Sequence, residues 1–155
     1  MCLTDLERFT PAKKGWQVKR RALGMRHHYF SVFHGSEMYQ LGKTYEAASH
    51  PINTETGFTG VEYGKRRRRP YMSGFHVFNR LEDAQRYLQA RGGPPNEYCI
   101  IQVECGGTKT TGYQEFEYLA MTTRGAHMFT CKAKVTVCKT ITLLKEVSYG
   151  TIKNK

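Results

Sequence analysis

The chain has 155 residues, of which 39% are hydrophobic, 12% aromatic and 24% charged, and its formal net charge is +11 at pH 7. This length and apolar content exclude an intrinsically disordered protein and are typical of a single globular domain. No apolar stretch reaches the roughly 18 residues of a membrane-spanning helix, and the first residues lack the pattern of a secretory signal peptide. We therefore expect a soluble, cytoplasmic protein with no membrane partner.

The N-terminal part is expected to hold an arm and several short strands. Residues 1–12 form the arm, and their apolar spacing predicts a short helix before Pro11. A first strand is expected near Gln17. Aromatic and β-branched residues at 29–33 and 39–45 predict two further strands, and the glycine and serine between them are typical of a hairpin connection.

A long loop is expected next. Residues 47–70 hold three glycines, two prolines and a run of cations, a composition typical of an irregular segment, with a brief strand at 58–63. Loops of this length are often functional. A short strand at 74–78 then leads out of the loop.

The clearest helix covers residues 81–91, where Leu81, Ala84 and Leu88 form one apolar face. Asn79 is expected as its N-cap, with Glu82 as the partner of a capping box. Two glycines and two prolines follow the helix and predict its end. Beyond it, alternating apolar and polar residues predict strands at 98–104, 130–137 and 140–147, with a Gly- and Thr-rich turn at 105–111.

These elements predict an α+β fold with a single globular domain over residues 13–148 and a tail at 149–155. The domain is expected to be a curved, mainly antiparallel sheet of roughly five to seven strands with the main helix packed on it. Oligomeric state does not follow from these patterns.

Five cysteines, an odd number without a signal peptide, predict reduced thiols rather than a disulfide framework. Their spacing lacks the short cysteine pairs of structural zinc sites, so no metal is expected. Cys131 alternates with Lys132 and Lys134 as in a half-buried strand, which predicts a small core residue and not a nucleophile.

The strongest indication of function is the charge. Five cations follow one another from Lys65 to Arg69, and a second segment, 13–26, has six cations and no acid. Such a run cannot enter a core, so it lies in solvent or against a polyanion. Aromatic rings beside Arg can stack on unpaired bases while the guanidinium groups hold phosphates. The predicted partner is therefore nucleic acid, RNA or DNA, or a nucleoprotein, and an acidic protein surface stays open as an alternative. The predicted contact residues are Lys65, Arg66, Arg67, Arg68, Arg69, Lys13, Lys14, Lys19, Arg20, Arg21, Trp16 and Tyr71.

Several short motifs also carry a resemblance. Tyr39-x-x-Gly42-Lys43-Thr44-Tyr45, the segment Gly74-Phe75-His76-Val77-Phe78 and the closing strand at 141–147 resemble a group of small uncharacterised phage and prophage proteins. The resemblance implies a phage accessory protein that acts in the bacterial host cell. Inhibitors of bacterial defence systems, including anti-CRISPR proteins, are common in this size range.

An enzymatic alternative starts from Val32-Phe33-His34-Gly35-Ser36, which resembles the His-Gly-Ser/Thr motif of ADP-ribosyltransferases. The resemblance implies NAD as cofactor, with His34 on the adenosine ribose. His76 would lie in the second motif, at a position where the family usually has Tyr or Ser, and Glu117 would stabilise the oxocarbenium-like sugar cation as nicotinamide leaves. Binding without a cofactor is the preferred interpretation, and a virion or scaffold component is a further alternative.

Overall fold

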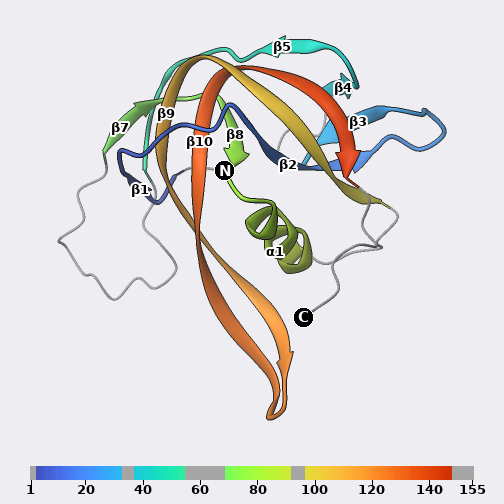
Figure 1. Cartoon of the computed structure of the whole chain (residues 1–155), viewed down its shortest axis with the longest axis vertical. Coiled ribbons are helices and arrows are strands. Elements are labelled where there is room, and N and C mark those ends of the chain that lie inside the picture. The colour runs from blue at the N-terminus through green and yellow to red at the C-terminus, as the bar shows by residue number, and fades with distance from the viewer. Residues whose placement is uncertain (1–2, 33–36, 55–68, 92–96, 148–155) are drawn as a thin grey trace.

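The computed structural model describes residues 3–32, 37–54, 69–91 and 97–147, and these form a strand-dominated fold with one helix (Figure 1). The elements are β1 (Asp5–Leu6), β2 (Lys14–Arg21), β3 (His28–Ser31), β4 (Met38–Gln40), β5 (Thr44–Glu46), β6 (Pro51–Asn53), β7 (Pro70–Met72), β8 (Phe75–Phe78), α1 (Leu81–Arg91), β9 (Tyr98–Thr122) and β10 (Gly125–Val147). The prediction of an antiparallel sheet with a main helix at 81–91 is confirmed.

The main sheet has eight strands and closes on itself. Its order is β1-β9-β10-β8-β2-β3-β4, β5 pairs with β10, and β2 pairs with both β8 and β9. Strands β2, β9, β10 and β8 therefore form a ring, while β6 and β7 form a separate ladder. The strand number exceeds the prediction because β1 lies in the arm and the segment 39–45, expected as one strand, forms both β4 and β5. Conversely, the two strands expected at 130–137 and 140–147 are one continuous strand, β10.

One long hairpin dominates the molecule. Strand β9 has 25 residues and β10 has 23, and they pair from Ile100–Val147 to Thr122–Gly125. The predicted turn at 105–111 is wrong, because β9 runs through it. Its glycines serve close packing instead: a Cβ on Gly106 would lie 2.4 Å from Thr140 Oγ1. The pairing shifts between Cys138 and Thr140, and such an irregularity bends a strand.

The N-terminal arm is extended, so the predicted helix before Pro11 is wrong. Asp5 and Leu6 pair with Tyr113 and Gly112 on β9. The chain then crosses β9 and β10, where Phe9 N donates to Thr111 Oγ1 across 3.4 Å and Ala12 N to Thr136 Oγ1 across 3.0 Å. Burial of Leu3 and pairing with the sheet thus override the helical spacing.

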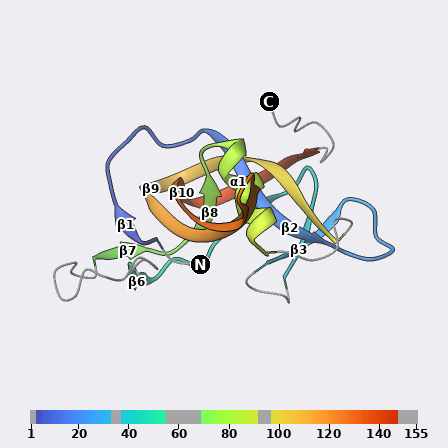
Figure 2. The same cartoon turned by 90° about the horizontal axis from the view of Figure 1, so that it is seen from below.

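Apolar clusters fill both sides of the sheet. On one side Tyr87 of α1 packs against Phe78 and Phe116, with ring centroids 5.5 and 5.2 Å apart. Figure 2, seen from below, shows α1 within the curve of the β9–β10 hairpin. A second cluster includes Val77, Ile101 and other residues of β9, β10 and β3. Because successive strand residues face opposite sides, Val77 and Phe78 enter different clusters.

Two local predictions have contrasting outcomes. Cys131 is a buried free thiol, as predicted, and so are Cys99, Cys105 and Cys138. Asn79 does not have the predicted capping role: its Oδ1 accepts from Thr136 Oγ1 across 2.7 Å, which ties the start of α1 to β10.

No helix in the described ranges is both long and apolar enough to cross a membrane.

Candidate ligand pocket and basic surface

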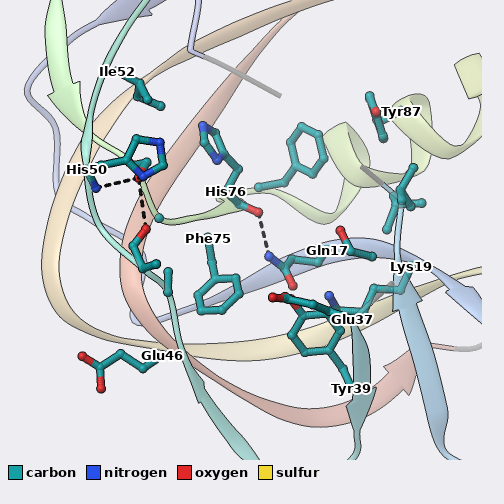
Figure 3. Close-up of a pocket in the computed structure, with 18 residues that line it drawn as sticks. Gln17, Lys19, Glu37, Tyr39, Glu46, His50, Ile52, Phe75, His76 and Tyr87 are labelled. Atoms are coloured by element: carbon teal, nitrogen blue, oxygen red, sulfur yellow. Dashed lines mark hydrogen bonds between the residues drawn. The ribbon is translucent and has the colours of Figure 1, made fainter. Parts of the chain in front are cut away.

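A pocket of about 470 Å³ lies where the two apolar clusters meet. Its walls come from β2, β3, β4 and β8 and from the segment between β5 and β6. Apolar side chains from both clusters contribute, among them Val18, Tyr39, Phe78 and Tyr87. The polar side chains labelled in Figure 3 come from segments that are far apart in the sequence, from Gln17 to His76.

Lys19 contributes a buried amine to this pocket. The residue is only 3% exposed, and its Nζ lies 3.9 Å from the centroid of the Tyr39 ring. Burial lowers the Lys19 pKa to about 8, against the opposing effects of Cys99 and Glu37. A cation–π contact with Tyr39 partly stabilises the ammonium group, but it uses none of its three N–H donors in a hydrogen bond.

Gln17 and His76 form the neighbouring wall (Figure 3). Gln17 Nε2 donates to the His76 carbonyl oxygen across 2.9 Å, which sets the orientation of the amide because a carbonyl only accepts. Within the described residues, Gln17 Oε1 is buried without a hydrogen-bond partner. Burial lowers the His76 pKa to about 4, so this imidazole is neutral at pH 7.

Ser73 and His50 lie together at the pocket wall. Ser73 Oγ lies 3.1 Å from His50 Nδ1, accepts from His50 N across 3.0 Å and donates to the Ala48 carbonyl oxygen across 3.3 Å. The single hydroxyl hydrogen of Ser73 has two acceptors within reach, the Ala48 carbonyl oxygen and His50 Nδ1, and the His50 tautomer decides between them. The contacts hold residues 48–50 against the β7–β8 connection.

A second candidate site lies on β10 beside the N-terminal arm. We call it the basic surface, and its central residues are Lys132 and Lys134. Lys132 Nζ lies 4.4 Å from the centroid of the Tyr113 ring, and Lys134 Nζ lies 5.3 Å from that of Phe9. Both lysines are exposed, and Glu115 is the cross-strand partner of Lys132. These lysines were not among the predicted contact residues, although their alternation with Cys131 was a signal that could have identified them.

The predicted contact residues at 13–21 differ in their exposure to solvent. Lys13, Lys14 and Arg20 are exposed, and Arg20 lies over the Phe30 ring at 5.4 Å. Lys19 is buried, so it cannot reach a phosphate at the surface. The charge of Arg21 is compensated by an ion pair with Glu146, to which its Nε donates across 3.0 Å.

The two aromatic residues of the prediction also change role. Tyr71 is buried, and its hydroxyl accepts from Leu3 N across 2.8 Å and lies 3.3 Å from His76 Nε2. Trp16 is partly buried against the core. Because their rings take part in packing, the prediction that these two residues stack on bases is not supported by the structure.

Of the cation run, only Arg69 lies within the described residues, and Lys65, Arg66, Arg67 and Arg68 lie outside them. Arg69 Nη1 donates to the Leu6 carbonyl oxygen across 3.1 Å and lies 4.0 Å from Asp5 Oδ1. Arg69 N also donates to Thr54 Oγ1 across 2.9 Å. The residue that ends the run is therefore fixed beside the N-terminal arm.

The residues of the enzymatic alternative are not all assembled. His34 lies outside the described residues. His76 pairs with Val137 on β10, whereas Glu117 pairs with Thr130 on the same strand. The pairing positions are seven residues apart, which corresponds to about 23 Å along a strand. Glu117 is exposed and does not line the pocket that His76 lines.

In the described part of the chain, no group of three or more His, Cys, Asp or Glu side chains is placed to hold a metal ion. Comparisons with protein-family models, curated proteins and solved structures find no match to this chain.

Proposed function

We propose that this protein binds a polyanion, RNA or DNA alone or within a nucleoprotein, through the basic surface and the N-terminal arm. The observation that carries the proposal is the pair of exposed lysines on β10, Lys132 and Lys134, each held over an aromatic ring. Their ammonium groups are positioned for phosphate. The rings of Tyr113 and Phe9 are partly exposed and offer faces beside them for a base.

The arm connects several cations into one surface. Arg69 donates to Leu6 at one end of the arm, and Phe9 contacts Lys134. Ala12 donates to Thr136 on β10, and Lys13 follows with its side chain exposed. The phosphates of a nucleic acid strand lying along the arm would thus contact Arg69, Lys134 and Lys13 in turn. The net charge of the chain, +11, adds to this attraction.

In this proposal the biological role is that of a phage-type accessory protein. Occupation of a nucleic acid or nucleoprotein by the basic surface would block another ligand, as an inhibitor of a bacterial defence system does. Contacts of this kind give strong salt dependence and little base specificity, since they address phosphates rather than base edges.

The test is a charge reversal at the two lysines. In the double variant Lys132→Glu, Lys134→Glu, affinity for a fluorescent single-stranded RNA or DNA should fall about ten-fold or more at moderate salt. The slope of log K against log salt concentration should become less steep by about 1.4 for two lost phosphate contacts. Fluorescence anisotropy over a salt series measures both.

The matched control is Lys43→Glu with Lys145→Glu, which makes the same change in net charge at two exposed lysines away from the arm. It should retain most of the affinity. Equal losses in both double variants would mean that only net charge matters, and no detectable binding by the wild-type protein at physiological salt would refute the proposal.

An ADP-ribosyltransferase is the second candidate, favoured by the position of the pocket. Ser31 and Val32, at the end of the strand that leads into the His34 motif, face the same pocket as Gly74 and His76 of the second motif. Two observations oppose this candidate: Glu117 lies far from the pocket, and the Glu37 carboxylate in the pocket lining repels the phosphates of a dinucleotide.

Release of nicotinamide from NAD by the purified protein is the decisive assay for this candidate. If the activity exists, His76→Ala should reduce it, whereas Glu117→Gln should leave it unchanged because Glu117 lies outside the pocket. Absence of nicotinamide release by the wild-type protein, with intact NAD recovered, would leave binding as the function.

A further inference from the structure

The Lys19 amine is a buried polar group that the fold compensates only in part, through the Tyr39 ring and the charge of Glu37. It is 3% exposed, and within the described ranges no hydrogen bond to its Nζ is present beside the contact with the Tyr39 ring. A buried ammonium without acceptors is unfavourable, so such lysines are rare in cores unless they are paired. Lys19 lines the pocket, where a ligand could supply the missing partner.

The pocket restricts what that ligand is. Its volume of about 470 Å³ lies within the range of sites for small molecules. The aromatic rings of Tyr39, Phe75 and Tyr87 line the pocket and favour a ligand with an apolar or aromatic body (Figure 3). Glu37 also lines the pocket, and its carboxylate disfavours an anion, whereas the carboxylate of Glu46 forms an ion pair with Lys139 across 3.3 Å.

We propose that the pocket binds a neutral carbonyl compound, an aldehyde or ketone with an apolar or aromatic body, and that Lys19 captures it as an imine. This site is separate from the basic surface, and the inference does not rest on polyanion binding. A carbonyl oxygen satisfies the requirement for an acceptor near Nζ, and a carbonyl carbon is the electrophile that a desolvated amine attacks.

The reaction balances without a further reactant. The lone pair of the neutral amine adds to the carbonyl carbon, and a proton passes from nitrogen to oxygen to give a carbinolamine. Loss of water then leaves the C=N bond. Burial favours the first step, because a pKa of about 8 instead of 10.5 raises the neutral fraction of Lys19 about 300-fold over that of an exposed lysine at neutral pH.

The experiment traps the imine on the full chain. Wild-type protein is incubated at neutral pH with benzaldehyde and sodium cyanoborohydride, whose hydride reduces the imine carbon while nitrogen takes a proton from solvent. Peptide mass mapping then compares labelling at each lysine. Lys19 should carry at least about ten-fold more label than exposed Lys132 or Lys134, as expected for an activated amine.

Three controls distinguish binding of the aldehyde in the pocket from the general reactivity of lysines with aldehydes. Lys134→Met should leave labelling of Lys19 unchanged. Ala48→Trp, at an exposed position of the pocket lining, keeps the amine but narrows the pocket, and should reduce Lys19 labelling several-fold. In place of benzaldehyde, 4-carboxybenzaldehyde should label Lys19 less, because the Glu37 carboxylate in the pocket lining repels its charge.

Labelling of the folded protein in proportion to exposure, with Lys19 among the least modified lysines, would overturn the inference. So would equal labelling of Lys19 in the wild type and in Ala48→Trp. Binding of single-stranded nucleic acid should be the same in Lys19→Met as in the wild type, so failure of the pocket inference and failure of the proposed polyanion binding are distinguishable.

Discussion

Thr136 on β10 donates its hydroxyl to Asn79 Oδ1 across 2.7 Å and accepts from Ala12 N across 3.0 Å. A single fully buried side chain thus joins the sheet to the start of α1 and to the N-terminal arm. Because the hydroxyl serves two partners at once, its loss removes the partner of the part-buried Ala12 amide and that of Asn79 Oδ1.

Thr136→Val should therefore lower the free energy of unfolding by about 1–3 kcal/mol, although the side chains have nearly the same shape. Urea denaturation measures the change. On the same strand, Thr142→Val removes only an exposed hydroxyl contact with Thr44, which water replaces, and should change stability by less than about 0.5 kcal/mol. Equal effects of the two substitutions would contradict this account of Thr136.

His76 should make stability depend on pH in a defined window. Burial lowers its folded pKa to about 4 from the ordinary value of 6.5, so between these values only the unfolded chain binds the proton. The contribution is present above pH 6.5 and is lost as pH falls toward 4, by about 3 kcal/mol in total. As the pH falls from 6.5 to 4, the free energy of unfolding should decrease less in His76→Gln than in the wild type. Parallel profiles of the two proteins would show that His76 is not buried in neutral form.

Lys19→Met should stabilise the protein at pH 7. The folded pKa of about 8 lies below the ordinary 10.5, so the charged amine opposes folding at neutral pH, and wild-type stability should rise with pH between 8 and 10.5. Methionine fills a similar volume without charge, and a gain of about 1–3 kcal/mol is expected. Thermal or urea unfolding at pH 7 tests this, and a loss of stability would mean that the ammonium has a partner that compensates its burial.

Gly112→Ala should detach β1 from the sheet. A Cβ at this position would lie 2.3 Å from the Asp5 carbonyl oxygen and 2.9 Å from Leu3 Cδ1, and the first of these atoms belongs to the backbone and cannot rotate away. Hydrogen exchange at the Thr4 amide, which donates to the Tyr113 carbonyl oxygen across 2.8 Å, should become faster.

The control for the arm is Thr108→Ala, an exposed position on the same strand. It should leave exchange at the Thr4 amide unchanged. If the arm is part of the basic surface, Gly112→Ala should also weaken nucleic-acid binding, whereas Thr108→Ala should not. Unaltered protection of Thr4 in Gly112→Ala would show that the arm adapts to the added methyl group.

Local sequence patterns determined the elements whose stability is local. The helix at 81–91 has an apolar face and strong stop signals, and the alternation at 130–137 identifies a half-buried strand with Cys131 inside. The exposure of Lys13, Lys14 and Arg20 also follows from charge alone, since isolated cations remain in water unless a partner is available.

Tertiary contacts decided the rest. The spacing of the arm suggested a helix, but pairing of β1 with β9 was more favourable, and glycines at 106 and 107 lie in a bend of β9 and not in a turn. The pocket has no local signature because its walls come from β2, β3, β4 and β8, which meet only after the sheet closes. For the same reason Lys19 looked like any other cation of a basic segment. Only closure of the sheet buries its amine over Tyr39, while Lys132 and Lys134 stay at the surface.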